Sequence, residues 1–142
     1  MIALDTNVLV RFLVEDDARQ SVAAASLVNQ VAAEDDRLFV SDVVLCETVW
    51  VLAGSYGISK AAIIDTMRGL IRARHLAFDA PDRLVRALDA FERGKGDFAD
   101  YVIREHARAA GCTAVATFDR SLLRDAGFVS PAVRGEGEKG RG

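Results

Sequence analysis

The sequence predicts an α/β protein, a three-layer α/β/α sandwich around a short-stranded, mainly parallel sheet. Short apolar runs alternate with longer helical segments, as is typical of a parallel sheet covered on both faces. A length of 142 residues favours a single domain with one core. We therefore predict one domain over residues 1–131. Residues 132–142 are predicted to be a disordered tail, because "RGEGEKGRG" has no apolar surface to bury.

The individual elements follow from local sequence signals. Short apolar runs predict strands at residues 2–4, 38–40, 75–78, 113–118 and 128–130. Helical spacing and alanine content predict helices near residues 8–14, 15–36, 42–57, 60–74, 81–94 and 98–111. Ser41 and Ser59 are expected to cap two of these helices, and Pro81 stands where a helix start tolerates proline. The segment 119–127 is predicted to be a turn or a short helix.

Composition excludes several classes of protein. Hydrophobic residues make up 51% and charged residues 27%, no apolar run is long enough to span a membrane, and Asp5 interrupts the N-terminal apolar run too early for a signal peptide. Cys46 and Cys112 are interpreted as buried, reduced thiols, which favours a cytoplasmic location. Because the formal net charge is −3, any nucleic-acid binding must depend on locally placed basic residues.

Two aspartates directly follow predicted strands. Asp5 ends the strand at 2–4, and Asp119 ends the strand at 113–118. Ligands of open parallel sheets bind beyond the carboxyl ends of the strands, so both acids are expected at one edge of the sheet. The alternative for each is an ordinary helix cap or turn aspartate.

Three further acids are candidates for the same site. Glu47 stands in the apolar helix "VVLCETVWVL", which predicts a buried glutamate that needs a cation, a donor or a proton; the alternative is a glutamate paired with a core arginine. Asp97 and Asp100 in "GDFAD" share one helix face at i, i+3 spacing, although Asp97 is equally suited to cap the helix. Asp100 begins an apolar stripe with Ile103 and Ala107 and is expected to face inward.

Carboxylates that converge at one sheet edge repel each other unless a cation neutralises them. A ligand set made only of oxygen atoms favours a hard ion, Mg²⁺ or Mn²⁺, over zinc. Carboxylate-bound Mg²⁺ is suited to phosphoryl chemistry. The sequence therefore predicts a magnesium site, with manganese as a possible substitute.

In this order, "LDTNVLV", "CETVWVL", "DFADYVI" and "TFD" resemble the motifs of the PIN-domain ribonucleases, and in particular the VapC-like toxins of toxin–antitoxin pairs. The resemblance covers about residues 1–130. It implies a PIN-like fold and a metal-dependent endoribonuclease that hydrolyses RNA phosphodiester bonds. It also implies a cognate antitoxin protein and a homodimer.

The resemblance assigns roles to individual residues. The four family acids fall on Asp5, Glu47, Asp100 and Asp119, with the metal on the three aspartates and Glu47 completing the shell or orienting the water. Supporting roles fall on Thr6, Asn7, Asp97 and Thr117. Tyr101 departs from the alanine or serine that often follows the third acid in the family, which we expect to affect substrate fit.

Five arginines lie near the four motifs in the sequence, and two other functions remain open. Candidates for contacts to RNA phosphates, by their position near the motifs, are Arg11, Arg104, Arg108, Arg120 and Arg124; solvated or ion-paired helix charges are the alternative. One rival function is an aspartyl-nucleophile phosphatase or phosphotransferase, although its usual second aspartate is here Asn7. The other is a non-catalytic nucleic-acid-binding module with purely structural acids.

Overall fold

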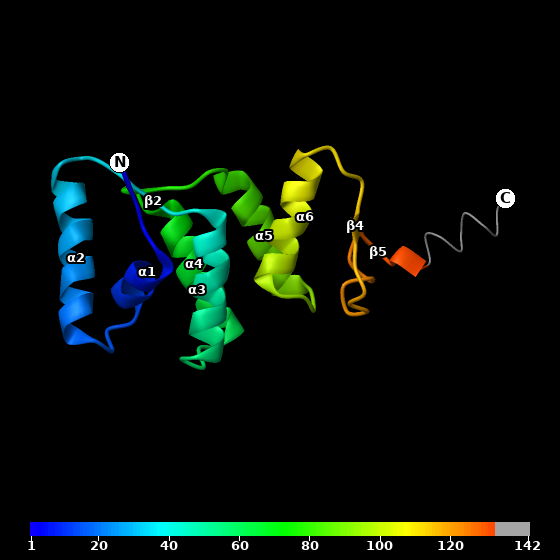
Figure 1. Cartoon of the computed structure of the whole chain (residues 1–142), viewed down its shortest axis with the longest axis horizontal. Coiled ribbons are helices and arrows are strands. Elements are labelled where there is room, and N and C mark those ends of the chain that lie inside the picture. Colours follow the sequence, from blue (N-terminus) through cyan, green and yellow to red (C-terminus); the bar gives the residue numbers. More distant parts are fainter. Residues whose placement is uncertain (133–142) are drawn as a thin grey trace. The chain divides into compact units, whose positions relative to one another are not determined.

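The computed structural model describes residues 1–132, which belong to two compact units (Figure 1). The first unit spans Met1–Val85, and the second begins at Arg86. The boundary lies within one helix, α5 (Pro81–Arg93).

A three-stranded parallel sheet organises the first unit. Its strands are β1 (Ile2–Ala3), β2 (Leu38–Phe39) and β3 (Leu76–Ala77), in the order β1-β2-β3. Ile2 pairs with Leu38, and Leu38 pairs with Leu76. Because all three strands run in one direction, the residues that follow them leave the sheet at the same edge.

Four helices of the first unit each begin at a residue whose side chain accepts a backbone N–H. They are α1 (Thr6–Leu13), α2 (Ala18–Ala33), α3 (Asp42–Gly54) and α4 (Lys60–Arg72), capped by Asp5, Asp17, Ser41 and Ser59 respectively. Such caps satisfy backbone donors that the first helical turn leaves unpaired. Apolar side chains from the helices and from β2 are fully buried, among them Leu9, Leu38, Leu45 and Met67. Asp5 lies between β1 and α1, and the buried core beneath them fixes its position.

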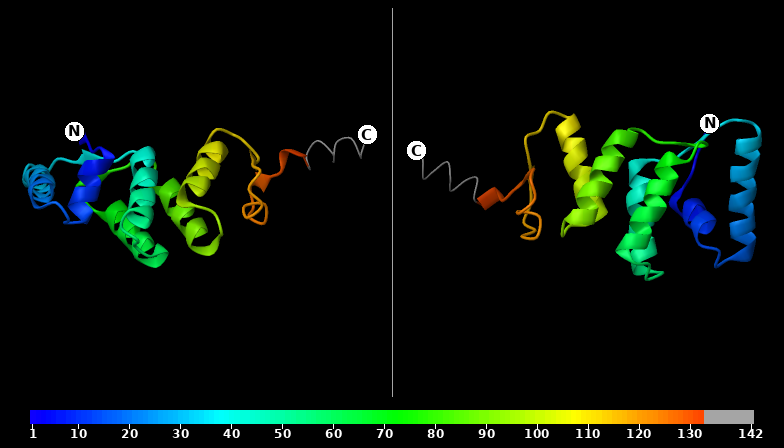
Figure 2. Two further views of the ribbon diagram at one scale, coloured as in Figure 1. Left: turned by 60° about the horizontal axis from the view of Figure 1, so that its bottom comes forward. Right: turned by 180° about the vertical axis from the view of Figure 1, so that it is seen from behind.

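The second unit contains the end of α5, then α6 (Phe98–Ala109), β4 (Val115–Ala116) and β5 (Phe128–Val129). The two strands pair in parallel, with Val115 opposite Phe128. The views in Figure 2 show the end of α5 beside α6, and Arg86 and Glu105 join them. Phe98 and Tyr101 of α6 are fully buried, and the ring of Phe128 meets Tyr101 edge-on. This packing fixes the first turn of α6, which carries two of the candidate acids.

Most sequence predictions of the elements are confirmed. Each observed strand lies inside its predicted range, every strand pair is parallel, and residues 119–127 form turns. The strands are divided between two sheets, one in each unit. No helix within residues 1–132 has the length and apolar character to cross a membrane. The predicted tail lies outside the described residues, except for Ala132, and the single domain over 1–131 stays a prediction.

The prediction that both cysteines are buried is wrong for Cys112, which is exposed on the turn after α6. Cys46 is half-buried, and burial raises the pKa of its thiol to about 11. Both cysteines are free, as predicted.

Candidate active site

In the first unit, Thr6 holds two of the candidate acids. Its backbone N–H donates to Asp5 Oδ1 at 2.8 Å, and its hydroxyl donates to Glu47 Oε1 at 3.0 Å. Thr6 is buried at the first position of α1, whereas both carboxylates are exposed. One fixed residue therefore orients two carboxylates that come from α1 and α3.

The predicted burial of Glu47 is wrong. The helix α3 buries the face made by Val44, Leu45, Thr48 and Val49, and Glu47 lies on its opposite face. Val43 and Trp50 share that face with Glu47 and are 68% and 54% exposed. The alternative of a core arginine partner is not observed either: within residues 1–132, Glu47 accepts a hydrogen bond from the Thr6 hydroxyl. The apolar composition of α3 gave a wrong prediction for Glu47 because Val43 and Trp50, two large apolar residues, face outward.

In the second unit, Asp97 and Asp100 lie at the start of α6. Asp97 is the N-cap residue, as the sequence allowed, and its backbone N–H donates to Asp100 Oδ2 at 2.8 Å. This bond fixes the Asp100 side chain over the first turn. Asp100 is half-buried and Asp97 is exposed. The expected apolar stripe through Ile103 is wrong, because Ile103 is exposed while Tyr101 and Val102 face the core.

The surroundings of Asp100 disfavour its ionised form. Burial raises the pKa of its carboxyl, and the negative charges of Asp97 and Asp119 raise it further, against the lowering effect of the Asp97 N–H. The charge of Asp119 therefore acts on Asp100 within the second unit. A bound cation would relieve the effect of these negative charges on Asp100.

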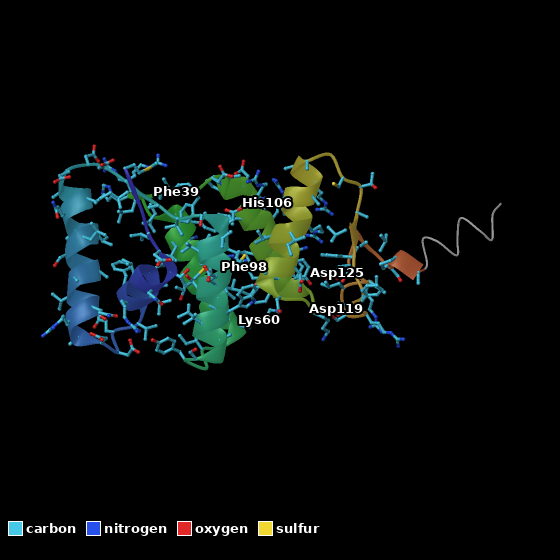
Figure 3. All side chains as sticks on the ribbon, in the orientation of Figure 1. Phe39, Lys60, Phe98, His106, Asp119 and Asp125 are labelled. Atoms are coloured by element: carbon cyan, nitrogen blue, oxygen red, sulfur yellow. The ribbon has the colours of Figure 1, made fainter. Side chains whose placement is uncertain are left out.

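Asp119 lies in the turn after β4, where Figure 3 labels it. Its Oδ1 accepts the N–H of Ser121 at 2.9 Å and the Ser121 hydroxyl at 2.6 Å. These bonds, the hydroxyl first, lower the pKa of the Asp119 carboxyl. The hydroxyl of Thr117 accepts the backbone N–H of Asp119 at 3.1 Å, which supports the predicted role of Thr117. Asp119 is thus kept ionised and in a fixed orientation.

Tyr101 fixes the glycine-rich turn that leads into the acids. Its hydroxyl donates to Asp125 Oδ2 at 2.5 Å and accepts the N–H of Gly96 at 3.0 Å. A Cβ on Gly94 would lie 1.8 Å from that hydroxyl, and a Cβ on Gly96 would lie 2.3 Å from Leu122 Cδ2. Only glycine fits at these two positions. Tyr101 therefore acts as a buried support for the turn, which its sequence position alone did not reveal.

The structure brings the predicted residues together in two sets. Asp5, Thr6 and Glu47 form one set in the first unit, and Asp97, Asp100, Thr117 and Asp119 form the other in the second. Asn7 is exposed and lines a pocket of about 380 Å³ between α1 and α2, and it forms no hydrogen bond to an acid within residues 1–132. Within residues 1–132, no three His, Cys, Asp or Glu side chains lie together in a way that could hold a metal ion. Ser121 is a supporting residue that the sequence analysis missed, although a serine two residues after an aspartate is a known turn signal.

The donor chemistry of both sets fits a hard divalent cation. Every candidate ligand atom is a carboxylate oxygen, and Asp100 is held beside other negative charges. Mg²⁺ and Mn²⁺ prefer such oxygen ligands. The residues present are therefore compatible with the predicted magnesium.

The five arginines predicted to contact phosphate fall into three groups. Arg11 is engaged by Asp16, Gln20 and Tyr56, which supports the ion-paired alternative for this residue. Arg120 and Arg124 are exposed. Arg104 is buried and Arg108 is bound to Glu105, and both line a pocket of the second unit that is considered below.

Replacing Thr6 by valine is expected to lower cleavage of RNA while the fold is kept. Valine keeps the shape of the buried side chain but removes the hydroxyl that orients Glu47. The substitution removes a hydrogen bond that orients a ligand, but it removes no ligand. We therefore expect kcat to fall roughly 10- to 100-fold, as it does when a residue that supports a metal ligand is replaced. Thr66→Val is the matched control, because the Thr66 hydroxyl bonds only the Ala62 carbonyl within α4. Equal kcat values for the two variants would rule out this role of Thr6.

Comparison with known proteins adds the family. Residues 2–129 match the PIN domain family. Among solved structures, the chain is similar to the Mycobacterium tuberculosis toxin VapC20, which is described as cleaving the sarcin–ricin loop, with 20% identity and a TM-score of 0.39. That match covers 92% of this chain and 100% of the other. No curated protein matches the chain.

Proposed function

Because this chain belongs to the PIN-domain family, we propose that it is a metal-dependent endoribonuclease that uses Asp5, Glu47, Asp100 and Asp119. The α/β/α PIN fold predicted from the sequence agrees with this membership. The single observation that carries the proposal is the setting of Asp100, a half-buried carboxylate held beside Asp97 and Asp119. A protein gains nothing in stability from such repulsion, so a cation-binding role explains it best.

In the proposed reaction, water hydrolyses an RNA phosphodiester bond. When bound, a divalent cation would supply charge stabilisation and would lower the pKa of the attacking water. Asp5, Asp100 and Asp119 are the carboxylates that would bind the cation, and Ser121 keeps the Asp119 carboxylate ionised and oriented. Thr6 orients Glu47, which completes the ligand shell or positions the water. The bond from the Asp97 N–H keeps Asp100 in place during turnover.

Removing divalent metal is the direct test of this function. We expect the purified chain to cut a structured RNA with Mg²⁺ or Mn²⁺, to lose activity in EDTA, and to regain it when the metal is restored. Unchanged cleavage in EDTA would contradict the proposal. A trapped aspartyl-phosphate would favour the phosphatase alternative, and metal binding without cleavage of any RNA would favour a binding module.

We also propose that the nuclease is the toxin of a toxin–antitoxin pair, a homodimer that acts in the cytoplasm and is inhibited by an antitoxin protein. The resemblance of "LDTNVLV", "CETVWVL" and "DFADYVI" to VapC-like toxins supports this finer assignment. Expression of this chain alone is expected to arrest growth, and co-expression with the product of the neighbouring gene is expected to restore it. Normal growth with soluble, active protein would exclude the toxin role.

A further inference from the structure

The second unit holds an arginine-lined pocket that the proposed nuclease chemistry does not use. It has a volume of about 370 Å³ and lies between the end of α5, α6 and the turn around Asp125. Its lining includes four arginines and two aspartates: Arg86, Arg93, Arg104, Arg108, Asp89 and Asp125. Small-molecule pockets span about 300–1,000 Å³, so this pocket suits a group the size of one nucleotide.

A buried glutamate fixes three of these arginines. Glu105 is 3% exposed, and its carboxylate lies 2.6 Å from Arg86 Nε, 2.9 Å from Arg108 Nη1 and 3.5 Å from Arg104 Nε. The Arg86 and Arg108 side chains remain 57% and 45% exposed. Each guanidinium carries five N–H donors, so both arginines keep donors available for a ligand. The buried carboxylate thus orients the arginines before any ligand arrives.

Arg104 forms a rigid part of the pocket wall. Its Nη1 donates to the Ala126 carbonyl at 3.0 Å, and its guanidinium lies over the rings of Tyr101 and Phe128. Its Nε is buried and has no hydrogen-bond partner. The Glu105 carboxylate, 3.5 Å from Nε, balances its charge, so Arg104 shapes the pocket wall and the more exposed arginines remain for a ligand.

Arg93 supplies charge that no neighbour neutralises. It is exposed at the end of α5, and no hydrogen bond or ion pair joins it to another residue within 1–132. Asp125 is occupied by the Tyr101 hydroxyl. With Asp89, Asp125 and Glu105 counted against the four arginines, the pocket keeps a positive charge in a chain of net charge −3.

We propose that this pocket binds the phosphate of a nucleotide, either within an RNA strand or as a free nucleotide. Arginine is suited to phosphate because its planar fork of donors matches the phosphate oxygens. Donors that are oriented in advance reduce the entropy lost on binding. Binding of an RNA strand rests on the proposed function. In that case the pocket would bind a phosphate of the strand other than the one at the bond that is cut.

The experiment measures binding in EDTA, where no cleavage is required. An RNA oligonucleotide is titrated by fluorescence anisotropy at several salt concentrations, and melting temperatures are recorded with AMP or inorganic phosphate against sodium chloride of equal ionic strength. The pocket variants are Arg93→Gln and Ala90→Glu, because both side chains line the pocket outside the Glu105 cluster. The control is Arg37→Gln, which removes an exposed arginine before β2 in the first unit.

The wild-type protein and Arg37→Gln are expected to bind RNA alike and to melt at higher temperature with phosphate or AMP. Arg93→Gln is expected to bind RNA about 3- to 10-fold more weakly and to reduce the salt slope by about one, and Ala90→Glu is expected to bind worse still. Loss of the AMP and phosphate response with unchanged RNA affinity assigns the pocket to free nucleotides. Pocket variants that match the wild type in both assays would overturn the proposal. RNA that is bound in this pocket but never cut would instead contradict the proposed nuclease.

Discussion

Asp100→Asn is expected to abolish RNA cleavage while leaving the protein folded and at least as stable as the wild type. Asparagine matches aspartate in shape, and its carbonyl oxygen can still accept the Asp97 N–H. It removes an anionic metal ligand, so we expect the rate to fall on the order of 100-fold or more, because the metal supplies both the nucleophile and the charge stabilisation.

The stability part of this prediction follows from the raised pKa of Asp100. A carboxyl whose pKa is higher in the folded state than its ordinary 3.8 binds protons more tightly when folded, so its ionisation destabilises the fold above that pH range. Asparagine removes that cost at neutral pH. Mg²⁺ is expected to raise the melting temperature of the wild type and to raise that of the variant less.

Cleavage assays and melting curves check both parts, with Asp65→Asn as the control. Asp65 is an exposed aspartate of α4, so its replacement changes the net charge equally without touching the acids. If Asp100→Asn cuts RNA as fast as Asp65→Asn, Asp100 is not a ligand.

Glu105→Gln is expected to give the largest loss of stability. Glu105 is buried beneath three arginines, and glutamine cannot neutralise them. Breaking a buried ion pair costs about 3–5 kcal/mol. We expect about 3 kcal/mol here, because Arg86 and Arg108 are half exposed and can regain water.

The contribution of Glu105 to stability is expected to depend on pH. Burial alone would raise the pKa of Glu105, but the hydrogen bond from Arg86 and the charges of Arg108, Arg86 and Arg104 bring it below its ordinary value of 4.5. A lowered carboxyl pKa contributes stability above pH 4.5 that is lost as the pH falls through the lower, folded-state pKa. Urea unfolding at pH 7 and in acid measures this directly. The difference between wild type and Glu105→Gln should shrink in acid, whereas Glu15→Gln, at an exposed position before α2, should match the wild type throughout. If the difference in free energy of unfolding were the same at every pH, the ionised Glu105 carboxylate and its arginines would not be its cause.

The sequence predicts local structure well where a single residue marks a boundary. Ser41, Ser59 and Pro81 mark three helix starts correctly, because caps and proline act within one turn of the chain. Asp5 and Asp97 are likewise both N-cap residues, as their alternatives allowed. Capping and metal binding use the same carboxylate chemistry, so the cap does not exclude the proposed role.

Properties that depend on packing were predicted less well. The burial of Glu47 was wrong because the apolar count of a helix does not reveal which side packs. The Thr6 bond to Glu47 joins residues 41 positions apart, and the Tyr101 bond to Asp125 joins residues 24 positions apart. No local pattern encodes such partners. Glu105 was missed for the same reason, since its arginines come from two helices.

The central claim is that Asp5, Glu47, Asp100 and Asp119 bind the catalytic metal, and a crystal structure of the protein with Mn²⁺ tests it most directly. Mn²⁺ replaces Mg²⁺ at oxygen sites and is located by its anomalous scattering. The account predicts an anomalous peak that is bound by carboxylate oxygens of these acids. A fully loaded crystal with no peak at any of these acids would contradict it.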